Sequence, residues 1–431
     1  MKLRMRFNMR ILCLVLLPLL MGACAFQRTT VLDLQQKEVE GLRLEVLAGE
    51  AGAEQHFLLW FEQPLDHHNP KAGSFWQRVW WSHKDKDAPV VLVTEGYSAP
   101  ALYRSELATL LDANQLVVEH RFFSASVPDS LPWDLLTVEQ AARDQQRIAA
   151  FFKRMYRGNW VSTGISKGGQ AALVHRALFP RQMQATITYV APFNMAREDV
   201  RLQTFFKEVS DAKTRERILA FQKELLQRRR EVFPYFEDWV AERELTFSLD
   251  LEQVFELAVL EYPFSFWQWG VPPAEIPSEG ASGLALFEHL YRGIDFSYFS
   301  EQDALAVGPF FYQAYRELGY YAYDAAALLP WLKHFDTPVV SNAFMVPSEA
   351  GMPVFDRSML RRVEERLRRK DPAVLHIVGA RDPWSATAFD VEGLKNSVRI
   401  IDTEGSHLTR IQTLPEDLRQ RVLLWLEDNL Q

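Results

Sequence analysis

Residues 160–172 read WVSTGISKGGQAA, and this stretch carries the strongest structural signal in the chain. Apolar and β-branched residues lead into Gly164-x-Ser166-x-Gly168, and small residues then begin an amphipathic helix. The pattern is typical of a nucleophile elbow, in which a serine stands at the apex of a sharp turn from strand to helix. The glycines fit this interpretation because a larger side chain beside the serine would collide with the strand or the helix. A glycine-rich turn without any chemistry is the plainer alternative.

The same turn predicts where a negative charge would be stabilised. The N-terminus of the helix after Ser166 presents unpaired backbone N–H groups and the positive end of the helix dipole. We therefore expect the N–H of Lys167 to form one half of an oxyanion hole. The second N–H should come from the Gly96-Tyr97 turn, which follows an earlier buried strand. The positive charge of Lys167 is taken as incidental.

Apolar runs on both sides of the elbow predict a sheet. Continuous apolar runs are typical of strands buried on both faces, as in parallel sheets. A helix begins at Thr137, whose capping-box partner is Gln140. The alternation of strands and helices implies a doubly wound, mostly parallel sheet. We expect antiparallel strands at 42–46, 56–61 and 73–81, and buried strands at 89–97, 115–123, 160–164, 185–190, 373–379 and 398–401.

One long segment interrupts this pattern. Residues 194–332 show helical stretches, charged segments and clustered aromatic residues without a clear buried strand. We interpret them as a helical cap inserted into an α/β-hydrolase domain. The predicted organisation is a leader at 1–24, the first part of the core at 25–193, the cap at 194–332 and the second part of the core at 333–431.

An elbow serine needs a base, and the base needs an acid that holds it. In an α/β hydrolase the acid and then the histidine follow the serine along the chain, each in a loop after a strand. Asp382 follows a late strand and His407 follows the last one, so the predicted triad is Ser166, Asp382 and His407. Asp390 and Asp402 are rival acids, but Asp390 lies away from the strand end, and Asp402 is too close to His407 on the same loop.

The first 24 residues form a segment of their own. Four basic residues and no acid accompany an apolar run from Ile11 to Met21, which predicts a signal peptide. The run leads into Cys24 and resembles a bacterial lipobox, in which the cysteine becomes a lipidated N-terminus. Met21 is unusual in such a box, and cleavage after Ala23 or Ala25, or an uncleaved anchor, is the alternative. We expect an exported protein of the bacterial cell envelope, lipid-anchored to a membrane, the outer one in a Gram-negative cell.

Composition excludes several kinds of site. The only cysteines, Cys13 and Cys24, lie in the leader, so the mature chain has no disulfide and no cysteine nucleophile. The ten histidines show no His-x-x-x-His spacing on a helix, and we assign no metal and no cofactor. Without the leader, 44 basic residues stand against 56 acidic ones, a net charge of −12, and nothing here favours nucleic acid as a partner.

Five segments of the core, the elbow among them, form a set of motifs more specific than an elbow alone. They are FEQPLDHHNP at 61–70, TEGY at 94–97, EHRFF at 119–123, STGISKGG at 162–169 and DPWS at 382–385. Together they resemble the secreted bacterial serine peptidases of the tripeptidyl aminopeptidase type, the PS-10 peptidase family, which are distant relatives of Pro-Xaa carboxypeptidase and dipeptidyl peptidase II. The resemblance implies the same triad, an α-helical cap and the release of short peptides, as a rule tripeptides, from free N-termini, often after proline.

Four side chains are candidates for substrate binding. Glu95, Glu119 and Arg121 stand at strand ends that face the predicted site, where an acid can bind the free ammonium of a peptide. A salt bridge at the base of the loops explains them equally well. Trp384 either lines an apolar pocket for proline or packs against the sheet. Two other functions stay open: an esterase or lipase would share the triad, and a catalytically silent surface protein would share the fold.

Overall fold

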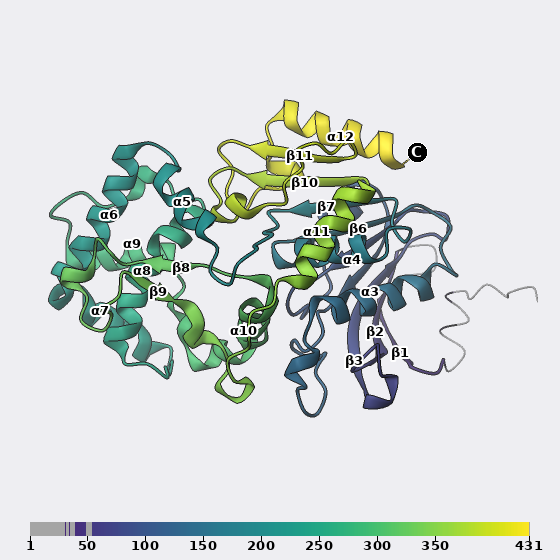
Figure 1. The fold of residues 1–431 in the computed structure, drawn as a ribbon, viewed down its shortest axis with the longest axis horizontal. Helices are drawn as coiled ribbons and strands as arrows, with labels where there is room; N and C mark the ends of the chain where they lie inside the picture. The colour runs from purple at the N-terminus through teal and green to yellow at the C-terminus, as the bar shows by residue number, and fades with distance from the viewer. Residues whose placement is uncertain (1–30, 32–33, 35–38, 49–53, 431) are drawn as a thin grey trace, which may run out of the picture.

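The structure is a computed structural model that describes Val31, Leu34, residues 39–48 and residues 54–430. The chain forms a nine-stranded sheet in the order β1-β2-β3-β5-β4-β6-β7-β10-β11 (Figure 1). Strands β1, β2, β3 and β5 pair antiparallel, and the strands from β5 to β11 in this order run parallel. The predicted doubly wound, mostly parallel sheet is confirmed. The strands are β1 (Leu42–Ala48), β2 (Gln55–Pro64), β3 (Ser74–His83), β4 (Val90–Thr94), β5 (Asn114–Val118), β6 (Trp160–Ile165), β7 (Ala185–Tyr189), β10 (Val374–Gly379) and β11 (Ser397–Asp402).

Helices cover both faces of this sheet because successive residues of a buried strand point to opposite sides. In β4, Val91 and Val93 pack in the cluster formed with α2 and α12, whereas Val90 and Leu92 pack in the cluster formed with α3. Helix α4 lies beside α3 on that second face, and α11 lies beside α4. Thr137 caps α3, since its side chain accepts a hydrogen bond from the Gln140 N–H, but the Gln140 side chain bonds Asp66 and the His67 N–H and does not complete the predicted capping box. The helices are α2 (Glu106–Leu110), α3 (Val138–Phe152), α4 (Lys167–Leu178), α11 (Ser358–Lys370) and α12 (Glu416–Leu430).

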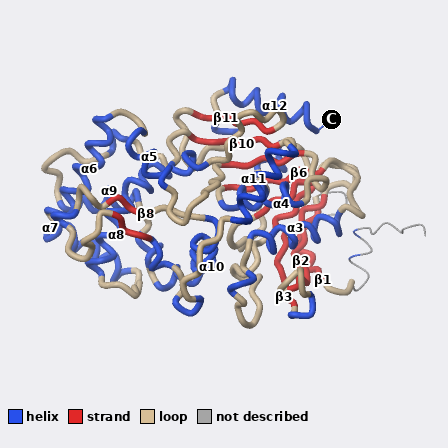
Figure 2. The backbone as a smooth tube through the Cα atoms, viewed as in Figure 1, coloured by secondary structure: helices blue, strands red, loops and turns tan. Residues whose placement is uncertain are grey.

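A second group of helices is inserted between β7 and α11 and forms a cap beside the sheet (Figure 2). Its interior is an aromatic core that includes Phe255, Tyr262 and Phe296, all fully buried, and this core accounts for many of the aromatic residues of the chain. The cap helices are α5 (Val200–Glu208), α6 (Ala212–Gln227), α7 (Arg229–Glu242), α8 (Leu251–Gln268), α9 (Gly283–Gly293) and α10 (Glu301–Gln313), which continues into a π-helical turn (Ala314–Leu318).

The structure adds a small antiparallel sheet to the cap, which we did not predict. It consists of β8 (Ala322–Asp324) and β9 (Val339–Ser341). Strands of three residues are too short to produce an alternating pattern in the sequence. β9 pairs with β8 but lies beyond residue 332, where the predicted cap ends.

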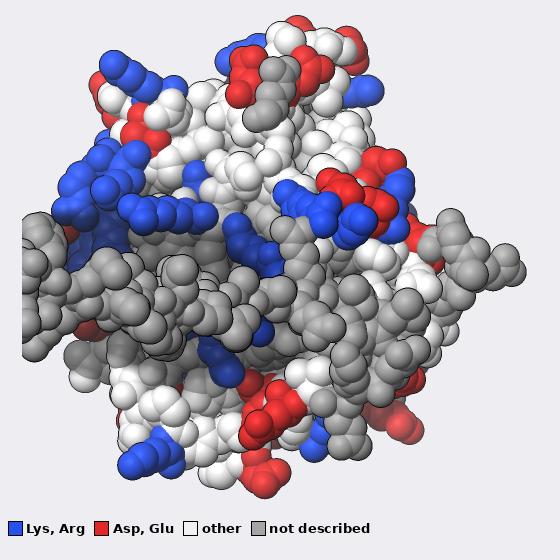
Figure 3. Space-filling model, turned by 90° about the vertical axis from the view of Figure 1, so that its right-hand side faces the viewer, with Lys and Arg blue, Asp and Glu red and all other residues white. Residues whose placement is uncertain are grey.

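The surface at the end of the molecule opposite the cap carries Lys, Arg, Asp and Glu side chains close together (Figure 3). On the part of that face that Figure 3 leaves uncovered, acidic side chains therefore alternate with basic ones. In the part of the chain that the structure describes, no helix is both long enough and apolar enough to span a bilayer. Both cysteines and the predicted leader lie outside the described residues.

Candidate active site

Ser166 stands at the junction of β6 and α4 in a strained backbone conformation. Its φ and ψ angles are 55° and −125°, in a region that residues with a side chain rarely occupy. The turn is held from both sides, since the Ser166 N–H donates to the carbonyl of Tyr189 on β7 at 2.8 Å and its own carbonyl accepts from Gln170 on α4 at 3.0 Å. This geometry is that of a nucleophile elbow and places Ser166 at the carboxyl-terminal end of a central strand.

Two glycines permit this turn because the backbone segments around it approach very closely. A Cβ atom on Gly164 would lie 2.3 Å from the backbone of Gly168, and one on Gly96 would lie 2.6 Å from the Gly168 nitrogen. The Thr94 hydroxyl closes the same contact by donating to the Gly168 carbonyl at 2.8 Å. The loop after β4 is therefore packed directly against the elbow, at the position where a second oxyanion donor is needed.

Asp382 and His407 come together although they lie in different loops, after β10 and β11. The Asp382 Oδ2 atom and the His407 Nδ1 atom are 2.7 Å apart, and both residues are buried. The other carboxylate oxygen accepts from the Trp384 N–H at 3.1 Å, which fixes the carboxylate plane. The rival acid Asp390 instead pairs with Arg368 on the surface. An acid bonded to Nδ1 leaves Nε2 of the imidazole free to act as a base.

The cap also contacts the histidine loop. The backbone N–H of His407 donates to the carbonyl of Gln268, the last residue of α8, at 3.0 Å. The next residue, Trp269, packs edge-on against the imidazole with ring centroids 6.1 Å apart. The C-terminus of the cap helix α8 therefore helps to position His407.

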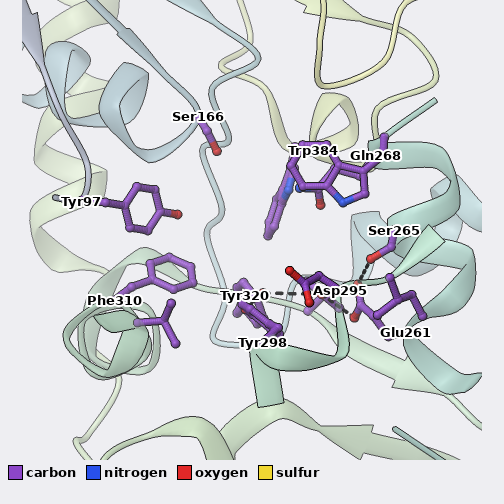
Figure 4. Close-up of a pocket in the computed structure, with 14 residues that line it drawn as sticks. Tyr97, Ser166, Glu261, Ser265, Gln268, Asp295, Tyr298, Phe310, Tyr320 and Trp384 are labelled. Atoms are coloured by element: carbon purple, nitrogen blue, oxygen red, sulfur yellow. Dashed lines mark hydrogen bonds between the residues drawn. The ribbon is translucent and has the colours of Figure 1, made fainter. Parts of the chain in front are cut away.

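Ser166 lines a pocket of about 260 Å³ between the core and the cap (Figure 4). The core contributes Ser166, Tyr97 and Trp384, and cap residues supply the remaining walls. The cap residues that line it are Glu261, Ser265, Gln268, Trp269, Ile294, Asp295, Tyr298, Val307, Phe310, Tyr320 and Tyr321. Among the described residues, neither the N–H of Tyr97, which lines the pocket, nor that of Lys167, which follows Ser166, has a hydrogen-bond acceptor.

Glu261 is the buried acid of the pocket, and sequence reasoning missed it. Its carboxylate accepts hydrogen bonds from the Ser265 hydroxyl and the Tyr321 hydroxyl, both at 2.7 Å. Burial raises the pKa of Glu261 to about 7. Figure 4 shows Glu261 across the pocket from Ser166, and Asp295, a second carboxylate that lines the pocket, is exposed. The pocket that holds Ser166 therefore also contains two acids.

Aromatic side chains form much of the pocket wall between Ser166 and Glu261. Trp384 lines the pocket, and its ring lies 5.6 Å from the rings of both Tyr320 and Tyr321. Phe310 of α10 lies 5.4 Å from the ring of Tyr97 on the other side. Such surfaces favour flat or compact apolar groups, including the pyrrolidine ring of proline.

Glu119 and Arg121 are not in the pocket, which corrects their assignment to substrate binding. Glu119 is fully buried, pairs with Arg78 and accepts from the N–H of Ala99 and from the hydroxyl of Ser126. Because these contacts engage both oxygens of the carboxylate, Glu119 has a structural role. Strand-end position alone did not distinguish this ion pair from a ligand site, because Arg78 comes from β3, far away in the sequence.

Arg121 belongs to a second buried network that explains one of the sequence motifs. It donates two hydrogen bonds to the carboxylate of Asp144 on α3, at 2.7 and 2.8 Å, and His67 contacts the same carboxylate at 2.7 Å. The motif around His67 therefore ties the end of β2 to α3. Glu95, the third candidate, is partly buried, is hydrogen-bonded by the Tyr103 hydroxyl and does not line the pocket.

Comparison with known proteins identifies the family of the chain. The model of the PS-10 peptidase S37 family matches residues 39–427. A prolyl tri/tetrapeptidyl aminopeptidase of Streptomyces mobaraensis is 32% identical over 385 residues, which cover 86% of this chain and 80% of the relative. The solved structure of a proline iminopeptidase of Mycobacterium smegmatis is similar with a TM-score of 0.45 at 13% identity, over 86% of this chain and 98% of the other. The chain therefore belongs to the PS-10 peptidase S37 family and is a serine-type peptidase with an α/β-hydrolase fold.

Proposed function

We propose that this peptidase removes short peptides, of three or four residues, from the free N-termini of its substrates, with a preference for proline before the cleaved bond. The observation that carries the proposal is the buried carboxylate of Glu261 across the pocket from Ser166. Further support comes from the relative in Streptomyces mobaraensis, which is named a prolyl tri/tetrapeptidyl aminopeptidase.

In the proposed reaction, His407 takes the proton of the Ser166 hydroxyl as the oxygen attacks the scissile carbonyl, and Asp382 holds the imidazole and stabilises its positive form. The N–H groups of Lys167 and Tyr97 receive the negative charge of the tetrahedral intermediate. The imidazolium then protonates the leaving amine, and the released N-terminal peptide remains as an ester on Ser166. Water activated by His407 hydrolyses that ester and restores the serine.

Recognition of the N-terminus falls to Glu261 and Asp295, in place of Glu95 and Glu119, which we first considered. A free ammonium offers a full charge and several donors, whereas an internal amide offers one neutral donor. The carboxylate of Glu261 lies in a desolvated wall, where a charge-assisted contact is stronger than in water. An N-terminus bound there leaves room for only a few residues before Ser166, which favours a short product over internal cleavage.

The preference for proline is supported by the aromatic walls formed by Trp384, Tyr320 and Phe310. A proline ring loses little conformational freedom on binding and packs well against aromatic faces. An esterase with the same triad would need neither a buried acid nor a fixed distance from it. Its activity is therefore one outcome of the test below.

We also propose that the protein is exported and anchored to a membrane by a lipid on Cys24. The support is the basic and apolar leader that ends in a lipobox-like sequence. A lipid anchor at this position would leave the catalytic domain free in the envelope, where peptide substrates are its partners.

The proposal is tested with a mixed peptide library, read by mass spectrometry, for the parent protein and for Ser166→Ala. We expect tri- and tetrapeptide products from free N-termini, enriched in proline at the cleaved position, and no products from the variant. A fluorophosphonate probe should label the parent and not the variant. Products from internal bonds, or hydrolysis of simple esters without any peptide product, would refute the aminopeptidase assignment.

A further inference from the structure

The Lys167 side chain is buried at the elbow, and the proposed reaction does not use it. It is 4% exposed, and its Nζ atom donates a hydrogen bond to the carbonyl of Gly96. Three aromatic rings surround the amine, those of Tyr97, Phe123 and Phe310, with centroids 5.2, 4.4 and 5.9 Å away. Burial lowers the pKa of Lys167 well below its usual value, an effect that the Glu317 carboxylate opposes. An amine is costly to bury, so its contact with Gly96 calls for an explanation.

The acceptor of this bond belongs to the peptide unit that carries a proposed oxyanion donor. The carbonyl of Gly96 and the N–H of Tyr97 are the two polar groups of one planar trans peptide, so they point in opposite directions. The amine of Lys167 is buried behind the elbow, whereas Ser166 and Tyr97 both line the pocket. A bond that holds the Gly96 carbonyl toward this amine therefore turns the N–H of Tyr97 away from the amine, which is the orientation that the oxyanion hole needs.

This peptide unit needs such a restraint because Gly96 precedes it. Glycine is required here by the close approach of the loop to Gly168, but it also allows the following peptide plane to rotate at little cost. A rotated plane would present a carbonyl where the oxyanion forms and would repel it. The aromatic rings shield the amine from water, which strengthens its hydrogen bond to the carbonyl.

We propose that the side chain of Lys167 is a positioning group that orients the Gly96-Tyr97 peptide so that the Tyr97 N–H completes the oxyanion hole. One residue then serves both donors, the first through its own backbone N–H and the second through its side chain. The inference rests on the proposed function, because it takes Ser166 as the nucleophile. It also assigns a purpose to a side chain whose charge was taken as incidental.

The test is Lys167→Met, which keeps the apolar length of the side chain among the rings and removes the donor. Loss of an oxyanion donor lowers kcat by roughly 10² to 10³. A donor that is still present but poorly oriented should cost less, so we expect kcat to fall about 10- to 100-fold with KM nearly unchanged. The affinity for a peptide boronate, whose tetrahedral adduct with Ser166 occupies the oxyanion hole, should fall by a similar factor. The affinity for the released product peptide should stay the same.

A chemical rescue separates positioning from packing. In the full chain with Cys13→Ser and Cys24→Ser, a cysteine placed by Lys167→Cys is the only one and can be alkylated in the unfolded protein before refolding. Bromoethylamine rebuilds a side chain of lysine length with its amine, and bromoethane gives the matched control without it. Rates are expressed per mole of serine labelled to completion by a fluorophosphonate, so that misfolded protein does not count. We expect the aminoethyl protein to regain kcat and the ethyl protein to remain impaired.

The outcomes distinguish this inference from the proposed function. If Ser166→Ala abolishes activity but Lys167→Met retains the parental kcat and boronate affinity, the positioning role is wrong and the proposed function stands. Equal kcat values for the two alkylated proteins would overturn the positioning role in the same way. Full activity of Ser166→Ala would instead overturn the proposed function.

Discussion

Glu261→Gln is the sharpest test of how the enzyme recognises a free N-terminus. The substitution removes the charge and keeps the shape of the side chain. The fold should tolerate it because the two partners of the carboxylate, the hydroxyls of Ser265 and Tyr321, can each donate or accept. The effect should therefore appear in substrate recognition and not in stability.

The magnitude follows from the burial of the carboxylate. A hydrogen bond between a buried carboxylate and an ammonium contributes about 1.4 to 2.8 kcal/mol, which corresponds to roughly 10- to 100-fold in kcat/KM. In the parent, kcat/KM for a peptide with a free N-terminus should thus be about 10 to 100 times that for its N-acetylated form. In Glu261→Gln the ratio should fall toward one, and it should do so because cleavage of the free peptide weakens.

The pH dependence of this ratio gives an independent check. Burial raises the pKa of Glu261 to about 7, so the carboxylate is protonated below that pH and cannot attract the ammonium at full strength. The ratio should rise as the pH passes through about 7, and it should fall again above about 8, where the peptide amine loses its proton. Any ionisation that affects the two peptides equally cancels in the ratio. The rise near pH 7 should vanish in Glu261→Gln.

Asp295→Asn is the matched control, since Asp295 is the other carboxylate of the pocket but is exposed. Equal rates for free and acetylated peptides in the parent would refute the aminopeptidase assignment. A ratio that survives in Glu261→Gln and collapses in Asp295→Asn would move the amine site to Asp295.

Three further predictions address the triad, the anchor and the fold. Asp382→Asn should lower kcat by about 10³ or more, and combining it with Ser166→Ala should cost no more than the serine change alone, as measured by steady-state kinetics. Cys24→Ser should release the protein from isolated membranes into the soluble fraction, and retention of a lipid-free, cleaved protein would point to a protein partner instead. Asp144→Ala leaves Arg121 buried without its partner and should lower the free energy of unfolding by about 3 to 5 kcal/mol in a denaturant titration, whereas an unchanged midpoint would show that the network does not stabilise the fold.

The core was predictable from the sequence because its signals are local. The elbow needs a particular order of small residues around Ser166, and the predicted acid and base follow strands that are recognisable as apolar runs. Asp382 and His407 were expected to meet because the ends of parallel strands converge at one edge of a sheet, and they are in contact in the structure.

The substrate-binding residues were not predictable in the same way. Glu261 lies in an apolar stretch of α8 that also contains Glu256, and nothing in the sequence separates the two. In the structure Glu256 pairs with the buried Arg229, whereas Glu261 lines the pocket. The difference depends on which element packs against each acid, and that is a property of the tertiary fold. The same reason led us to place Glu119 in the site although Arg78 neutralises it.

Helix α8 links recognition to catalysis, and this limits how the cap can vary. Glu261, Ser265 and Gln268 are spaced four and three residues apart, so they share one face of the helix, which lines the pocket. The first binds the substrate amine in our proposal, and the carbonyl of the last holds the backbone of His407. A shift of α8 that adjusts the distance to the amine therefore also moves the histidine loop. We expect changes of product length to be tolerated more readily in α10 and in the loop around Asp295 than in α8. Among the described residues, these two segments line the pocket without a backbone hydrogen bond to His407.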